Sequence, residues 1–224
     1  MGQFDGHRKR LRDRFLEHGL DALPDHQVLE LLLFHAISRK DTNPLARQLL
    51  DRFGTLSAVF DASMEDLMSV DGIGENTALL LYLITPMARR YMTSRMETGV
   101  ILSNTKAIGE YLVPFFFGAT EEMVYLLCMD AKCKVLCCKH LLTGSVNSAN
   151  FSFRKAAEVA ISCNASTVVL AHNHTSGVAT PSKADYDTTF LLREAFEALD
   201  IIVTDHIIVA DNDFISMSDS GFFR

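Results

Sequence analysis

Hydrophobic positions follow two different periods along the chain, and the change of period divides the sequence in two. Up to about residue 95, apolar residues recur at spacings of three and four, as in Val28, Leu31 and Leu32, which is typical of amphipathic helices. Beyond about residue 120, apolar runs of strand length alternate with helical patterns. The patterning predicts a small all-α domain at 1–98 and an α/β (α+β) domain at 99–224.

The second domain alternates strands and helices, which favours a mixed sheet flanked by helices. We expect strands at 121–130, 133–146, 166–174, 201–211 and 213–218, and helices at 153–164 and 181–200.

Composition and charge limit the functional classes. The formal net charge is −7, and neither half is basic, so the whole molecule has no strong attraction for nucleic acid. No apolar run approaches the roughly 20 residues of a membrane span, and no signal peptide is recognisable at the start. We therefore expect a cytoplasmic protein without a membrane partner. An odd number of cysteines, five, without a secretion signal predicts reduced thiols rather than disulfides.

One turn in the helical half has a specific pattern. Gly72 and Gly74 lie between two helical segments in a stretch that resembles a helix-hairpin-helix, whose glycine turn presents backbone N–H groups to a DNA phosphate. Asp71 and Glu75 give this turn an acidic rim, which opposes phosphate binding. Two interpretations stay open, DNA binding and a packing or partner-docking role.

A basic cluster near the start of the chain is the other candidate for nucleic-acid contact. Arg8, Lys9 and Arg10 follow one another in the first predicted helix. They form either a phosphate-facing patch or an ordinary solvated helix turn.

The strongest chemical signal is a pair of histidines at the end of a buried strand. Side chains alternate along a strand, so His172 and His174 point to the same face and form a natural metal pair. A helix follows, for which Thr180 and Pro181 are the expected N-cap and first residue. Asp185, on that helix, then supplies the third ligand. A His–His–Asp set leaves the fourth position of a tetrahedral zinc open for water, as in catalytic sites.

These residues carry a family resemblance. The segment 172–185 fits H-x-H-x7-S-x2-D, the signature of the JAMM (MPN+) metalloproteases. More narrowly, the chain resembles the bacterial RadC family, whose members pair this domain with an N-terminal helix-hairpin-helix region. The resemblance covers nearly the whole chain, including "LLLFHAI", "LARQLLDRFG" and "VDGIGENTA" in the first half, and "GSVNSA" and "DHIIV" in the second. It implies a JAMM/MPN-like mixed sheet flanked by helices.

The resemblance also implies roles for particular residues. His172, His174 and Asp185 would hold one Zn²⁺ per chain. Glu122, with its neighbour Glu121 as the fallback, would be the general base for the water that zinc activates. Ser182 would donate a hydrogen bond to the oxyanion of the tetrahedral intermediate.

Some positions depart from the family pattern. Thr175 stands where the family usually has proline after the second histidine, and Phe153-Arg154 replaces the usual Pro-Arg. These changes affect the expected substrate contacts more than the metal ligands. Asp205 and His206, in "DHIIV", are either close supports of the site or packed strand residues.

The leading hypothesis is a zinc-dependent hydrolase of peptide or isopeptide bonds, with a peptide or protein substrate. The alternative is a DNA repair or recombination factor that binds DNA through its helical half. A non-catalytic interaction domain is disfavoured because every metal ligand is present, and a zinc nucleobase deaminase is excluded because its H-x-E and P-C-x-x-C elements are absent.

Overall fold

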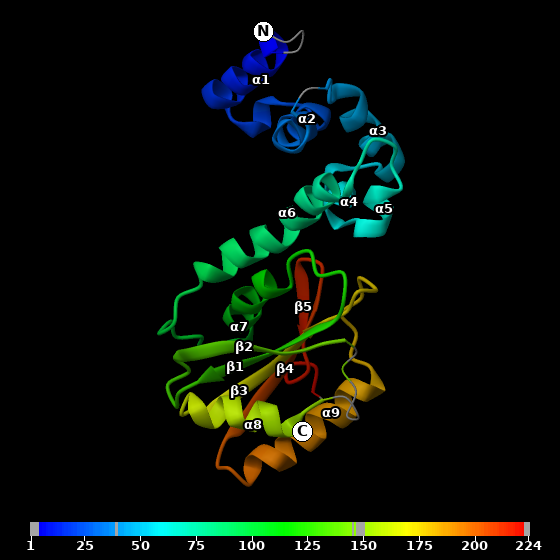
Figure 1. Cartoon of the computed structure of the whole chain (residues 1–224). Coiled ribbons are helices and arrows are strands. Elements are labelled where there is room, and N and C mark those ends of the chain that lie inside the picture. Colours follow the sequence, from blue (N-terminus) through cyan, green and yellow to red (C-terminus); the bar gives the residue numbers. More distant parts are fainter. Residues whose placement is uncertain (1–4, 39, 145, 147–150, 222–224) are drawn as a thin grey trace. The chain divides into compact units, whose positions relative to one another are not determined.

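The computed structural model of the chain describes residues 5–38, 40–144, 146 and 151–221. The chain forms two compact units, Met1–Met87 and Ala88–Arg224 (Figure 1), and each is described by itself.

The N-terminal unit is built from short helices, as the three- and four-residue spacing predicts. Its core is formed by leucines on the inner faces of the helices, among them Leu29, Leu33 and Leu49, all fully buried. Gly54 ends α3 with a positive φ of 88°, a conformation that favours glycine. The helices are α1 (Asp5–His18), α2 (Asp25–Ala36), α3 (Asn43–Phe53), α4 (Leu56–Asp61), α5 (Met64–Met68) and α6 (Glu75–Ser94), with a 3₁₀ turn η1 (Leu20–Ala22).

The two units divide inside α6, whereas the sequence places the domain boundary after residue 98. The last turns of α6 belong to the C-terminal unit, where Arg89 Nη1 donates a hydrogen bond to the backbone oxygen of Phe117 at 3.3 Å. Met96, just beyond the helix, packs against the core of the same unit. The change of hydrophobic period therefore marks where strands begin and lies beyond the division between the compact units.

The C-terminal unit is a mixed five-stranded sheet with helices on both faces. The strands lie in the order β2-β1-β3-β4-β5, and only the β3–β4 pair is parallel. The elements are α7 (Thr105–Leu112), η2 (Val113–Phe116), β1 (Met123–Met129), β2 (Val135–Thr143), α8 (Phe153–Ser162), β3 (Thr167–Asn173), α9 (Lys183–Glu197), β4 (Ile202–Ala210) and β5 (Asp213–Ser216). The predicted mixed α/β architecture is confirmed.

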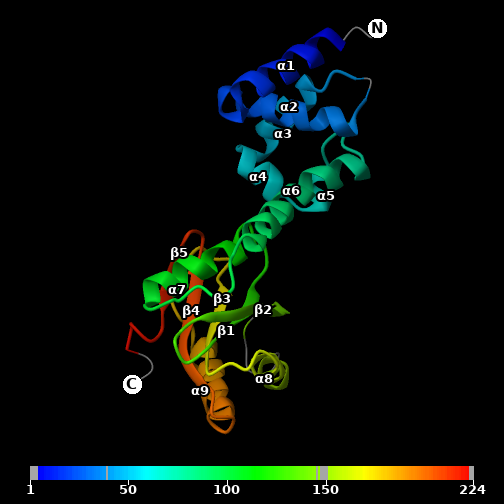
Figure 2. The same cartoon turned by 90° about the vertical axis from the view of Figure 1, so that its left-hand side faces the viewer.

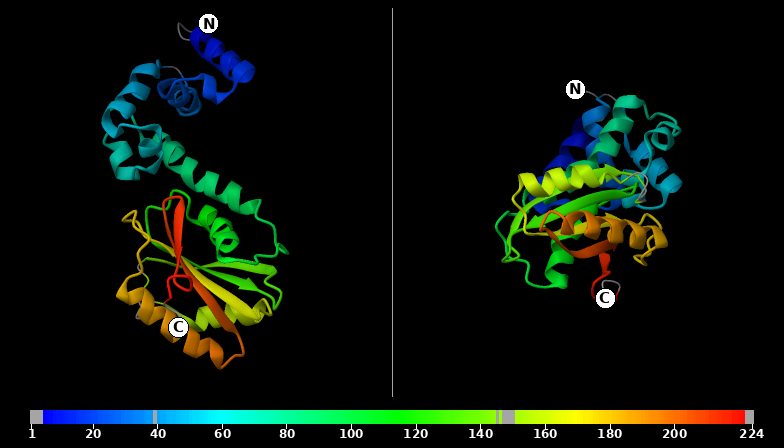
Figure 3. Two further views of the ribbon diagram at one scale, coloured as in Figure 1. Left: turned by 180° about the vertical axis from the view of Figure 1, so that it is seen from behind. Right: turned by 90° about the horizontal axis from the view of Figure 1, so that it is seen from below.

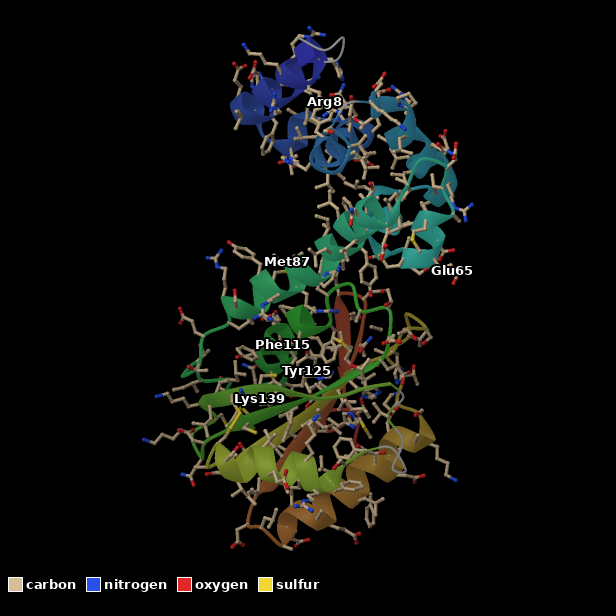
Figure 4. The ribbon with its side chains drawn as sticks, viewed as in Figure 1. Arg8, Glu65, Met87, Phe115, Tyr125 and Lys139 are labelled. Carbon is tan, nitrogen blue, oxygen red and sulfur yellow. A yellow bond between two sulfur atoms is a disulfide. The ribbon has the colours of Figure 1, made fainter. Side chains whose placement is uncertain are left out.

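Alternation along the central strands sends side chains into two separate cores. Figure 2 shows α7 on one side of the sheet and α8 and α9 on the other. On the α7 side, Tyr125 packs edge-on against Phe115 with ring centroids 5.2 Å apart (Figure 4). On the other side, where α8 and α9 lie under the sheet (Figure 3), the buried Leu170 of β3 packs with Leu192 and Phe196 of α9. His172, two residues after Leu170, continues this second face.

A β-bulge in β4 changes which of its side chains face α9. Val168 pairs with Val203, but Val169 pairs with Asp205, so one extra residue, Thr204, is accommodated in β4. The Thr204 hydroxyl donates to the backbone oxygen of Val168 at 3.1 Å. A bulge of this kind inverts the side-chain alternation after it.

The expectation of reduced thiols is wrong for two cysteines. Cys137 of β2 and Cys163, the C-cap of α8, form a disulfide. Cys128 faces Cys137 across the β1–β2 ladder and is fully buried. The packing of α8 on the sheet brings these side chains together across 26 residues of chain, a proximity that their spacing does not reveal. Among the described residues, no helix combines the length and apolar character needed to cross a membrane.

Candidate metal centre

The two histidines of the H-x-H pair lie at the carboxyl end of β3. His172 pairs with Val124 of β1 and with Ile208 of β4, so it stands in the middle of the sheet. The ladder continues past the end of β3, since the backbone N–H of His174 donates to the backbone oxygen of Val209 at 2.8 Å. Both imidazoles therefore have a rigid backbone beneath them, and both face the α9 side of the sheet.

The third member of the cluster comes from the first turn of α9. The prediction of Thr180 as N-cap and Pro181 as first helical residue is wrong, because Ser182 is the N-cap and Asp185 is the third residue of the helix. The two form a capping box: Ser182 N donates to Asp185 Oδ2 at 2.7 Å, and Asp185 N donates to Ser182 Oγ at 3.3 Å. The S-x-x-D spacing of the site motif is thus also the spacing of a helix cap.

Asp185 lies between the two histidines. Its Oδ1 is 3.1 Å from His172 Nε2, and its Oδ2 is 3.4 Å from His174 Nε2. Asp185 and His172 are each 1% exposed, whereas the His174 side chain is 15% exposed. The cluster is therefore sealed on the side of the sheet and open on the side of His174.

The hydrogen bonds around the cluster leave its ligand atoms as acceptors. His174 Nδ1 lies 2.9 Å from the backbone oxygen of Val178, which can only accept, so Nδ1 carries the hydrogen and neutral His174 has a bare Nε2. His172 Nε2 is buried and has no hydrogen-bond partner among the described residues, despite its closeness to Asp185. A buried nitrogen without a partner is costly unless a cation fills the space.

The electrostatics and spacing of the cluster also fit a divalent cation. Burial alone would raise the pKa of Asp185, but the backbone N–H of Ser182, which donates to its Oδ2 at 2.7 Å, acts in the opposite direction and favours the charged form. Asp185 is therefore a carboxylate. One ligand atom from each of His172, His174 and Asp185 can be chosen so that all three lie within 4.8 Å of one another, and imidazole nitrogen and carboxylate oxygen are both ordinary zinc ligands. The residues present thus fit zinc.

Glu122 directly precedes β1. Met123 packs into the core on the α7 side, so alternation turns Glu122 toward the opposite face, which is that of the two histidines. Continuing the Val124–His172 register by two residues sets Glu122 opposite His174. Its backbone oxygen accepts from Gly144 N at 2.7 Å, which ties it to the end of β2.

Asn173 holds the segment that carries Glu122, a role that sequence reasoning missed. Its Oδ1 accepts from Met123 N at 2.7 Å, and its Nδ2 donates to the backbone oxygen of Glu121 at 3.1 Å. The motif places an asparagine between the two histidines, but only the antiparallel pairing of β1 with β3 reveals what it bonds. The "GSVNSA" segment lies largely outside the described residues.

The residues expected to contact nucleic acid lie in the other unit. Gly72 has a positive φ of 89° in the turn between α5 and α6, and Gly74 is not among the glycines with positive φ. Asp71 and Glu75 are exposed beside the turn. The phosphate-binding role of this turn stays a prediction.

Arg8 is engaged within its own unit. Its guanidinium donates to the backbone oxygens of Ile37 at 2.6 Å and Lys40 at 2.8 Å, and it lies 4.7 Å from the ring centroid of Phe34. These bonds tie α1 to the end of α2. Lys9 and Arg10 are exposed, so the cluster splits into one structural residue and two at the surface.

Comparison with known proteins identifies the family to which the chain belongs. Residues 102–222 match the model of the RadC-like JAB domain, and residues 6–79 match the UPF0758 N-terminal family. A UPF0758 protein of Ruegeria pomeroyi is 36% identical over 216 residues, 96% of each chain. A UPF0758 protein of a Janthinobacterium species is 31% identical over 212 residues, 95% of each chain. The chain belongs to the RadC-like UPF0758 family.

Its RadC-like domain thus combines a JAB-type fold with a His–His–Asp cluster able to hold a metal. The departures from the expected RadC pattern lie away from the cluster's ligand atoms. Thr175 is exposed in the turn after β3. Phe153 packs against the ring of Phe151 at 5.0 Å, and Arg154 pairs with Glu158 on the surface of α8.

Proposed function

We propose that this protein is a zinc-dependent metallohydrolase of the JAMM type that cleaves peptide or isopeptide bonds. The observation that carries the proposal is the convergence of two histidine nitrogens on the Asp185 carboxylate, with the buried His172 Nε2 lacking a partner among the described residues. Such a set of acceptors is a cation site with three protein ligands, the number found in catalytic zinc sites.

The chemistry divides between the metal and the chain. Zinc, when bound, lowers the pKa of a water molecule and polarises the scissile carbonyl. Glu122, on the same face as the histidines, takes up the proton of the attacking water and returns it to the leaving amine. Ser182 is exposed at the helix start, and its bond from Asp185 N uses only an oxygen lone pair. Its hydroxyl hydrogen remains available to the oxyanion.

The metal is tested first. Purified wild-type protein should contain about one zinc per chain by elemental analysis, and His174→Ala should lose it, because a catalytic zinc site holds only three protein ligands. Far-ultraviolet circular dichroism of both proteins controls for folding. A folded wild type that binds no zinc after reconstitution would refute the proposal.

The general base is tested by a matched pair of neighbours. Glu122→Gln should keep its zinc and lose hydrolysis of a panel of quenched peptide and isopeptide substrates. The control, Glu121→Gln, removes the same charge one residue earlier, at an exposed position in the bend before β1. The assignment fails if Glu122→Gln keeps its activity or if Glu121→Gln is the inactive variant.

A further inference from the structure

A buried chain of hydrogen bonds runs behind the candidate metal centre. His206, on β4, is fully buried, and its Nε2 lies 2.8 Å from His172 Nδ1. On its other side, His206 Nδ1 lies 2.6 Å from the hydroxyl of Thr189 in α9. That hydroxyl lies 2.5 Å from the backbone oxygen of Asp185. The chain therefore starts at one candidate ligand and ends on the backbone of another.

With both histidines neutral, the hydrogens of this chain have one consistent arrangement. The backbone oxygen of Asp185 can only accept, and two oxygens 2.5 Å apart need a hydrogen between them, so Thr189 donates to it. The single hydroxyl hydrogen is then used, and His206 Nδ1 must donate to Thr189. Neutral His206 keeps a bare Nε2, which accepts from His172 Nδ1. His172 is thereby left with a bare Nε2 that faces Asp185.

The fold places His206 in this position through the irregularity in β4. Val203 packs on the α9 side and Ile207 on the α7 side, although both have the same parity along the strand. The extra residue at Thr204 produces this inversion and turns His206 toward α9. In a regular strand, His206 would face the opposite core, away from His172.

We propose that His206 and Thr189 are positioning residues that fix the tautomer and ring orientation of His172, so that its Nε2 lone pair is held ready for the metal. This inference rests on the proposed zinc site. The Thr189 hydroxyl sets the His206 tautomer, and His206 in turn sets that of His172. Because the chain ends on the backbone of Asp185, it also couples the helix that carries one ligand to the strand that carries the other two.

The test compares zinc affinity and tautomer state in a small set of variants. His206→Phe removes the acceptor for His172 Nδ1, and zinc should bind about 10- to 100-fold more weakly. His206→Gln offers an amide oxygen in its place and should recover most of the affinity. Affinity is measured by competition with a chromophoric chelator at pH 8. Long-range ¹H–¹⁵N spectra of zinc-free protein report which nitrogen of His172 carries the hydrogen.

Thr189 provides a finer comparison with a matched control. Thr189→Val removes the hydroxyl at nearly constant volume and should weaken zinc binding by about tenfold, while Thr189→Ser should stay close to wild type. Thr188 is the control, since it is the preceding residue of the helix, fully buried, with a hydroxyl that has no hydrogen-bond partner among the described residues. Thr188→Val should leave the zinc affinity unchanged.

Each result decides between the inferences. Wild-type protein with the hydrogen on His172 Nε2, or His206→Phe and Thr189→Val variants with wild-type affinity and tautomer, would overturn the positioning role. If wild type binds no zinc, the proposed function fails, yet the spectra of zinc-free protein still decide the tautomer. Should His206→Phe not fold, the contrast between Thr189→Val and Thr189→Ser carries the test.

Discussion

Replacing Asn173 by alanine tests whether this side chain holds the start of β1, and with it Glu122. Asn173 is 5% exposed and bonds Met123 N at 2.7 Å and the backbone oxygen of Glu121 at 3.1 Å. Truncation leaves the buried Met123 N–H without its acceptor, which costs about 1–3 kcal/mol. The partly buried backbone oxygen of Glu121 can bond to water instead, so the loss of this second hydrogen bond adds only about 1 kcal/mol to the cost. We expect a total loss of about 2–4 kcal/mol in the free energy of unfolding.

The structural part of this prediction is measured by urea unfolding, followed by circular dichroism, and by amide hydrogen exchange at Met123. The chain has no tryptophan, so ellipticity is the suitable signal. The Met123 amide should lose its protection, while amides in the middle of β3 should change only by the global loss of stability. A stability change below about 0.5 kcal/mol, or a Met123 amide that stays protected, would refute the reasoning.

The functional part separates positioning from stability. Asn173→Ala should retain zinc, because its side chain points away from His172 and His174. It should lower kcat by about 10- to 100-fold, since displacing a catalytic group by 1 Å can cost this much. Val169→Ala is the matched control: it creates a cavity on the same strand at a cost of about 1–3 kcal/mol without touching the start of β1. Equal loss of kcat in both variants would reduce Asn173 to a merely stabilising residue.

Two further predictions concern pH dependence and the basic cluster. Burial, with a smaller contribution from Cys138, raises the pKa of Tyr111 from 10.0 to about 12, so the folded state holds this proton more tightly than the unfolded state. The stabilisation that this higher pKa gives the folded state is fully present below pH 10 and is lost as the pH rises through 12. The free energy of unfolding of wild type, measured with urea, should therefore fall by about 1.3 kcal/mol more than that of Tyr111→Phe between pH 9 and pH 11. If the two proteins show the same dependence of this free energy on pH, the assignment is contradicted. Arg8→Gln should destabilise the protein by about 1.5–3 kcal/mol through its lost charged hydrogen bonds, while Lys9→Gln should change stability by less than about 0.5 kcal/mol. If the helical half binds DNA, Lys9→Gln should also flatten the salt dependence of binding to a duplex. If Arg8→Gln is as stable as wild type, the structural role of Arg8 is refuted, and Arg8 is again a candidate for contact with phosphate.

The sequence by itself determined the local structure and the residues that meet at the candidate metal centre. Continuous apolar runs of strand length predict β1, β3 and β4, because each of these strands is buried on both faces of a covered sheet. The i, i+2 spacing of His172 and His174 puts both imidazoles on one face. The S-x-x-D spacing of Ser182 and Asp185 is local too, since a capping box is made within four residues. Properties that depend only on neighbouring residues can be recognised without a fold.

The tertiary structure decided whatever depends on pairing between distant segments. The extra residue at Thr204 inverts β4 and turns His206 toward His172, which simple alternation does not foresee. The bonds of Arg8 to the end of α2 and the Cys137–Cys163 disulfide likewise join residues far apart in the chain. The physical reason is that register, bulges and helix packing are set by the summed burial of whole elements, so no short segment of sequence contains them.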